Sequence, residues 1–316
     1  MLAGVMLLWF IQVVLAVAFV AWDIRRTPEA AVMKWGFVVF TAYSGLFGAL
    51  LYVVACREPL PGTHEAYVSA RWRQVVGSTM HCVAGDGLGI LVAAAALAPL
   101  HLPPAMDLVV EYLVGFAFGW TIFQALFMRD MAGSYRQSLR NTFRPEMISM
   151  NGVMAALAAV SVPWKTAVPA ATSPSNPEFW FVMSIALCAG FVVAYPINWW
   201  LVANGLKHGM KTVTPEGTAP PLTAGLALAG ATLARATHPG HNDQATEHVA
   251  VDAPHDSGTA ATDLPSIAMA GPDMQLRDDP QAAPSRLELE TMIGASFALL
   301  AAGIVVASLA GSLLGG

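Results

Sequence analysis

Gly77-Ser78-Thr79-Met80-His81-Cys82-Val83-Ala84-Gly85-Asp86-Gly87-Leu88-Gly89 stands at the head of an apolar run that continues to Leu97. It places an imidazole, a thiol and a carboxylate in a stretch long enough to cross a bilayer. On a helix, one stripe carries Thr79, Cys82, Asp86 and Gly89, and its neighbour carries Gly77, His81, Gly85 and Gly89. Small residues allow a second helix to pack closely against the first. Burying an ionisable group in a membrane costs free energy unless the group is paired or has a function. The stretch predicts a helix whose polar stripe faces the interior of a bundle.

Composition agrees with a multi-pass membrane protein. Of the 316 residues, 56% are hydrophobic and 12% are charged, and the mean hydropathy is +0.56, which argues against an ordinary soluble domain. The net charge of -5 reflects a late hydrophilic segment and gives no sign of nucleic-acid binding. Three cysteines, two of them inside apolar runs, do not make a disulfide framework.

We therefore predict an all-α, polytopic membrane bundle of about seven transmembrane helices, with a long disordered loop before the last one. Four parts are expected: an N-terminal helix pair (1–71), a four-helix core (72–211), a His-bearing loop (212–286) and a C-terminal helix (287–316). The expected spans are Leu2–Trp22, Trp35–Ala55, Val75–Pro99, Met106–Phe127, Met147–Ala167, Phe179–Asn204 and Met292–Leu314.

Lys and Arg counts give an orientation. Twelve of the 16 lie in the second, fourth and sixth connections, although the first connection opposes this pattern. We expect a multi-pass protein of the bacterial inner membrane, with the N-terminus and residues 212–286 in the cytoplasm. Lys207 and Lys211 follow Trp199 and Trp200 and are interpreted as an interfacial anchor. The arginines from Arg129 to Arg144 are interpreted as a loop that contacts lipid headgroups.

The intramembrane polar residues suggest a cation site. The predicted ligand-binding residues are His81, Cys82, Asp86, Gln124, Asn151 and Asn198. Thioethers are soft ligands that select Cu(I). The expected metal ligands are therefore His81, Cys82 and Asp86 together with the methionines Met128, Met147, Met150 and Met154. Two simpler readings stay open: methionines commonly fill irregular cores, and Asp86 could merely bond a neighbouring helix.

The hydrophilic loop adds four histidines among carboxylates, His238, His241, His248 and His255. Imidazoles in a disordered segment can collect Zn, Ni or Cu, so these are further candidate metal ligands. A hydrophilic spacer that happens to contain histidines is the alternative.

Four ordered motifs resemble a known family. They are Met80-His81-Cys82-x-x-Gly85-Asp86, Phe123-Gln124-Ala125-Leu126-Phe127-Met128, Pro145-Glu146-Met147-Ile148-Ser149-Met150-Asn151, and Tyr195-Pro196-x-Asn198-Trp199-Trp200 with Gly205-Leu206-Lys207-His208-Gly209-Met210. From about Trp72 to Thr212 the chain resembles a bacterial membrane family catalogued as a domain of unknown function, number 4396. The resemblance implies an integral membrane protein and supplies no activity or catalytic residue.

Three functions are compatible with these residues. The first is transport or homeostasis of a transition-metal cation, copper favoured, in which protonation of Asp86 or His81 couples to ion movement. The second is an intramembrane enzyme with Cys82 as nucleophile and His81 or His208 as base. The third is a non-transporting assembly or metal-delivery factor. The bilayer and a metal ion are the expected partners, self-association is allowed, and no catalytic residue or certain cofactor is assigned.

Overall fold

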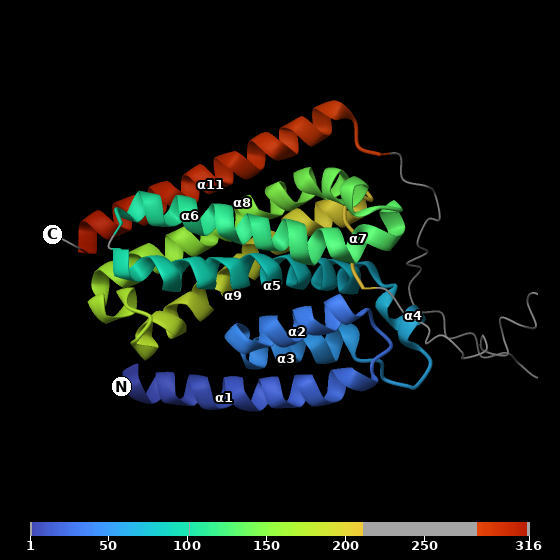
Figure 1. Ribbon diagram of the computed structural model, residues 1–316, viewed down its shortest axis with the longest axis horizontal. Coiled ribbons are helices and arrows are strands. Elements are labelled where there is room, and N and C mark those ends of the chain that lie inside the picture. The colour runs from blue at the N-terminus through green and yellow to red at the C-terminus, as the bar shows by residue number, and fades with distance from the viewer. Residues whose placement is uncertain (1, 101, 211–282, 315–316) are drawn as a thin grey trace, which may run out of the picture. The chain divides into compact units, whose positions relative to one another are not determined.

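The glycine-rich stretch forms the middle of α5 (Arg71–Leu97) in the computed structural model, which describes residues 2–100, 102–210 and 283–314. Every residue from Val75 to Gly87 is buried, so the polar stripe faces the bundle interior as predicted. All the described residues belong to one compact unit. Helix α5 packs on α2, α6, α8 and α9 within it (Figure 1).

The described chain is helical, and six of its helical stretches are long and apolar enough to cross a membrane. The predicted polytopic helical bundle is thereby confirmed. The remaining elements are α1 (Leu2–Asp23), η1 (Ile24–Arg26), α2 (Ala31–Ser44), α3 (Leu46–Leu51), η2 (Tyr52–Cys56), α4 (His64–Val68), η3 (Ala98–Leu100), α6 (Pro104–Ala117), η4 (Phe118–Gln124), α7 (Ala125–Ala132), α8 (Tyr135–Ala167), η5 (Pro169–Thr172), α9 (Pro177–Ala203) and α11 (Arg286–Leu314).

The span expected at Trp35–Ala55 is wrong, because the chain reverses inside it. Helix α2 ends at Ser44. The next residue, Gly45, has a φ of 59°, a conformation that favours glycine, and α3 and η2 then run back beside α2 and along part of α1 (Figure 1). The backbone N–H of Leu46 at the tip donates to Gln12 Oε1 of α1 at 2.6 Å. At the base, Tyr52 Oη lies 3.0 Å from Thr27 Oγ1 and donates to Asp23 Oδ2 at 2.8 Å. The segment is a re-entrant hairpin that enters and leaves at one end of the bundle.

This reversal changes the topology. Helices α1, α5, α6 to α7, α8 and α9 cross in alternating directions, so the start of α1 and residues 204–210 lie at opposite ends of the bundle. The start of α1 and residues 204–210 therefore do not share one side of the bundle, and residues 212–282 of the loop that was expected in the cytoplasm lie outside the described residues. We call the end at which α5 and α8 begin the arginine end. It carries every described Lys and Arg except Lys165.

Helix α8 begins at Tyr135, well before the expected Met147. Ser134 caps it by accepting a hydrogen bond from the Gln137 backbone N–H, just after the tight turn at Gly133. The predicted arginine loop is therefore helical. Its members in α8, Arg136, Arg140 and Arg144, are exposed and share one face because they are spaced by four residues. The same helical turns carry buried residues on the opposite face.

Glycines bring α5 and the α6 to α7 span into close contact. A Cβ on Gly85 would lie 2.8 Å from the Cα of Gly119, and a Cβ on Gly89 would lie 2.8 Å from the Cα of Gly115. Next to this contact, η4 is a π-type turn of the kind that widens helices at functional sites. At the far side of the bundle, α11 packs on α8, where a Cβ on Gly303 would collide with the Ala155 backbone.

We expect Gly45→Ala to destabilise the folded protein by about 1–3 kcal/mol, because the residue has a positive φ and a Cβ would collide with the Gln12 side chain. Unfolding of the detergent-purified protein measures the effect. Gly4→Ala is the matched control, since a Cβ there meets nothing within 4 Å. Equal unfolding midpoints for the two variants would contradict the hairpin.

Candidate functional site

An ammonium, a thiol and a carboxylate meet in the centre of the bundle. Lys207 Nζ lies 2.7 Å from Cys82 Sγ of α5 and 2.8 Å from Glu146 Oε2 of α8. The Cys82 thiol in turn donates to the same Glu146 oxygen at 3.2 Å. At most 1% of each residue is exposed. These three groups therefore contact one another without direct contact with solvent.

Asp86 extends the cluster by a second carboxyl group. It lies one turn beyond Cys82 on the same stripe of α5 and is fully buried. Both of its oxygens lack a hydrogen-bond partner among the described residues, and so does the neighbouring Glu146 Oε1. Two carboxyl groups close together and away from water disfavour double ionisation, so the pair is suited to sharing one proton. We call Cys82, Asp86, Glu146 and Lys207 the core cluster.

Gly119 of η4 makes room for the carboxyl pair. A Cβ at this position would collide with Asp86 Oδ1 and would lie 2.9 Å from Glu146 Oε1. The glycine contacts between α5 and the α6 to α7 span thus serve the site as well as the packing. Because Gly119 has no side chain, the Asp86 and Glu146 carboxyl groups can lie directly against the backbone of η4.

Lys207 reaches the cluster from the segment 204–210, which follows α9 and folds back on the start of α5. Gln74 fixes this segment: its Nε2 donates to the Met210 carbonyl at 3.0 Å, and its Oε1 accepts from the Gly209 N–H at 3.1 Å. The backbones touch here, since a Cβ on Gly209 would collide with Gln74. The segment closes the arginine end of the bundle over the cluster, and we call it the cap.

The interpretation of Lys207 as an interfacial anchor is wrong, because the residue is 1% exposed and paired inside the bundle. Burial lowers the pKa of its ammonium, but the Cys82 thiol and the Glu146 carboxylate raise the pKa more, so the net pKa lies above the ordinary value. Lys207 is therefore a cation at physiological pH. Hydropathy could not reveal this, since it does not report that the chain turns back after α9.

His81 is buried next to the core cluster and points elsewhere. Its ring packs on Phe123 and Phe127, with centroids 5.5 and 5.1 Å apart, and it hydrogen-bonds with Gln124. Its Nε2 has no partner among the described residues. Adjacent residues on a helix diverge, so His81 and Cys82 face different neighbours. Gln124 is thus a partner of His81, and the two form a polar pair beside the cluster.

The two predicted asparagines join helices. Asn151 accepts from Tyr112 Oη at 2.8 Å and donates to Ser296 Oγ of α11 at 3.0 Å. Asn198 donates to Ser149 Oγ of α8 at 2.8 Å and to the Ala194 carbonyl at 3.0 Å. Helix α9 stays continuous through Pro196. Both residues are fully buried, and the recorded contacts are those of interhelical bridges.

The methionines divide between core and rim. Met150 and Met154 belong to the main apolar core, as the packing alternative expects, whereas Met128 and Met147 are half-buried. Met150 is one helical turn beyond Glu146, and its Cε would lie 2.9 Å from a Cβ on Gly115. His238, His241, His248 and His255 lie outside the described residues. The three cysteines are free.

Sequence reasoning missed Glu146 and Lys207. Glu146 follows the arginines that were interpreted as a loop, but it lies inside α8 on the buried face. Its spacing of four residues from Met150 was the available signal, because that interval keeps two side chains on one helical face. For Lys207 the signal was weaker, since only its neighbours Gly205 and Gly209 indicate a turn.

Residues 71–207 match the model of the family described as "Domain of unknown function (DUF4396)", so the expected resemblance is confirmed. All four residues of the core cluster fall within the matched range. No curated protein and no solved structure gives a significant match to the chain. The site must therefore be interpreted from its own chemistry.

We expect Lys207→Met to lower the free energy of unfolding by about 3–5 kcal/mol, because it leaves the Glu146 carboxylate buried without its counter-charge. Denaturant titration in mixed micelles measures the loss. Adding Glu146→Gln should restore part of it, since the unpaired charge is then removed. Lys165→Met is the control: its partner Glu111 is 3.9 Å away and Lys165 is 24% exposed, so a smaller loss is expected. Equal losses for the two lysines would refute the pairing.

Proposed function

Given that residues 71–207 carry the domain of unknown function DUF4396, we propose that this helical membrane protein transports a transition-metal cation through the core cluster, with copper favoured. The observation that carries the proposal is the placement of Lys207 Nζ between Cys82 Sγ and Glu146 Oε2. The acceptors form a cation site, and the chain fills that site with its own ammonium.

Withdrawal of Lys207 would leave one thiol and two carboxyl groups facing one another at membrane depth. Thiolate is a soft ligand that selects Cu(I) and other transition metals, and carboxylates supply the charge that a desolvated cation needs. Met150, one turn from Glu146 on α8, is the nearest predicted thioether on that face. The favoured copper assignment rests on these soft donors.

The cap supplies the moving part of the mechanism. Lys207 belongs to the cap, which is held on α5 by the Gln74 side chain and by backbone contact at Gly209. Lifting the cap would open the arginine end of the bundle and remove the resident ammonium in one movement. An incoming cation would then restore the lost positive charge.

The proton of the carboxyl pair couples this exchange to pH. When a metal ion replaces the ammonium, the bound cation favours ionised Asp86 and Glu146 and a Cys82 thiolate. The proton shared by the acids and the thiol proton would leave as the metal enters. Cation movement in one direction with proton movement in the other would follow, because these ligands bind a metal ion in their deprotonated forms.

A cavity of about 730 Å³ offers a route at the opposite end. Its lining includes Asp107, Glu111 and Lys165, and it reaches down to Ala94 on α5, two helical turns from Asp86. Tyr112, next to Glu111, hydrogen-bonds with Asn151. The acidic groups in its lining would attract cations, so this cavity is the proposed outer vestibule.

Cysteine chemistry is the second candidate, favoured by the ammonium at Cys82 Sγ, because a nearby cation stabilises the nucleophilic thiolate. The groups at the thiol are Lys207 and Glu146 in place of the expected His81. An organic substrate would need access to a thiol that is 1% exposed, whereas a cation needs only the departure of Lys207. Transport is therefore the preferred function.

We expect proteoliposomes containing the full-length protein to take up Cu(I), held reduced, with protons moving the opposite way. Dyes for copper and pH inside the vesicles report both fluxes. Cys82→Ser and Asp86→Asn should slow uptake about 10–100-fold, as loss of groups at a metal site does. Cys188→Ser, which changes a thiol outside the cluster, should leave it unchanged. Uptake no faster than in protein-free vesicles would refute the proposal.

The arginine end is proposed to face the cytoplasm, because cytoplasmic ends carry the excess of Lys and Arg. In intact cells we expect an impermeant maleimide to label Ser175→Cys, exposed at the opposite end, and to spare Ser69→Cys, exposed at the arginine end. The three native cysteines are replaced in both variants. The reverse labelling pattern would invert the orientation.

A further inference from the structure

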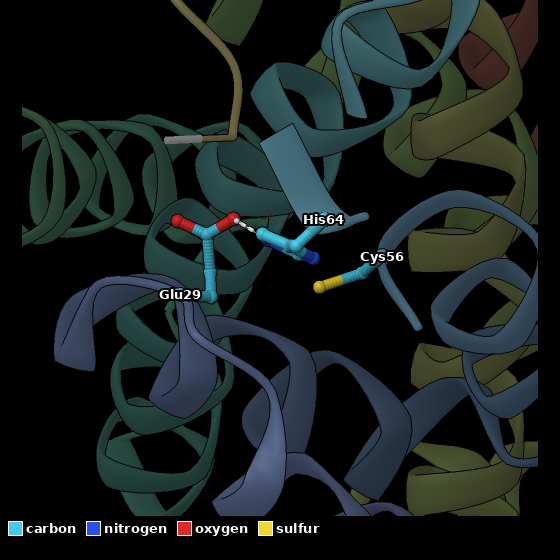
Figure 2. Close-up of side chains that lie close together, drawn as sticks. All are labelled: Glu29, Cys56 and His64. Atoms are coloured by element: carbon cyan, nitrogen blue, oxygen red, sulfur yellow. Dashed lines mark hydrogen bonds and ion pairs between the residues drawn. The ribbon is translucent and has the colours of Figure 1, made fainter. Parts of the chain in front are cut away.

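A second group of metal-binding side chains lies at the arginine end, at the base of the re-entrant hairpin. Glu29 is in the connection before α2, Cys56 is the last residue of η2, and His64 is the first residue of α4 (Figure 2). One ligand atom from each lies within 4.8 Å of the other two. None of the three belongs to the core cluster or to the range matched by the family model.

All three side chains are buried, with exposed fractions of 3% for Glu29, 0% for Cys56 and 1% for His64. Figure 2 shows the carboxylate, the imidazole and the thiol directed toward a common space. His64 Nε2 is 3.4 Å from Glu29 Oε2, a long contact for an ion pair, and His64 Nδ1 is buried without a hydrogen-bond partner among the described residues. Such an unpaired ring nitrogen is costly unless it binds something.

The backbone presents the carboxylate in a fixed orientation. The Ala30 N–H donates to Glu29 Oε1 at 2.9 Å, which leaves Oε2 directed at His64. Hydrogen bonds of this kind orient the ligands of metal sites. Tyr52, one turn before Cys56, bonds Thr27 and Asp23 and so fixes the base of the hairpin against the end of α1.

We propose that Glu29, Cys56 and His64 bind one divalent transition-metal ion, with Zn²⁺ the best fit. Imidazole nitrogen, thiolate sulfur and carboxylate oxygen are its usual ligands, and three protein ligands leave one position for water or an exchangeable group. Binding a thiolate and a carboxylate neutralises the 2+ charge, and the thiol proton is released to solvent. This set has one sulfur donor, no thioether, and an imidazole and a carboxylate, so it suits Zn²⁺ better than Cu(I), which prefers sulfur.

The three ligands come from segments that the hairpin separates. A metal ion there would link the connection before α2, the end of η2 and the start of α4, and so hold the base of the hairpin closed. The same space could instead hold only a buried Glu–His ion pair beside an inert thiol. These two readings differ in whether the thiol becomes a metal ligand.

Cobalt substitution tests the site in the full-length, detergent-purified protein, because Co²⁺ bound to thiolate gives a near-ultraviolet charge-transfer band that histidine-only sites lack. We expect the band, competed by Zn²⁺, in the wild type and in Cys82→Ser and Cys188→Ser. Cys56→Ser should abolish it, and Glu29→Gln or His64→Gln should weaken cobalt binding about tenfold or more. The amount of tightly bound zinc that remains after washing with a chelator should fall from one ion per chain in the wild type to none in Cys56→Ser.

The proposal fails if folded wild-type protein gives no thiolate band, or if the band survives Cys56→Ser and disappears in Cys82→Ser. Should Cys56→Ser not fold, alkylation of the wild type decides: Zn²⁺ must slow modification of Cys56, mapped by mass spectrometry, and leave Cys188 unaffected. Equal modification of Cys56 with and without Zn²⁺ would also overturn it. Copper flux plays no part in either readout, so this site and the transport proposal fail independently.

Discussion

The ion pair between Lys207 and Glu146 is the interaction on which the centre of this bundle depends. At 2.8 Å the attraction is worth roughly 6 kcal/mol for an effective dielectric constant of about 20, while removing two ions from water costs several kcal/mol each. The pair therefore adds little to the net free energy of folding, and two apolar side chains of similar volume would pack equally well. A need to hold α8 to the cap therefore does not explain the pair by itself, whereas the proposed exchange of Lys207 for a cation gives it a role.

Close helix packing makes this arrangement possible. Gly85 and Gly89 bring α5 against Gly119 and Gly115, and the absence of a side chain at Gly119 leaves space for the Asp86 and Glu146 carboxyl groups. The π-type turn η4 falls at this contact. The small residues thus have two roles. They allow close van der Waals contact between helices in a medium without a hydrophobic driving force, and they leave space for the Asp86 and Glu146 carboxyl groups.

Much of this architecture could be predicted from the sequence, because a long apolar run and its polar stripe are one-dimensional signals. The burial of Cys82 and Asp86 followed from helical periodicity alone. The hairpin could not be predicted in this way: hydropathy is the same for a helix that crosses and one that reverses, and the reversal depends on Gly45 and on the hydrogen bond from the Leu46 N–H to Gln12. Lys207 and His64 escaped notice for a related reason, since each enters its site from a short connection whose path is set by tertiary contacts.

The topology also explains why both candidate cation sites are reached from the arginine end. The hairpin returns to the end where it began, so Cys56 lies near Glu29 instead of a membrane thickness away. The cap likewise returns to the start of α5, so Lys207 reaches back to Cys82. In each case a segment that reverses direction brings a charged or ligating side chain to groups on the helices. A bundle of simple crossings would place those residues at the surface, where hydration would compete with every contact that they make.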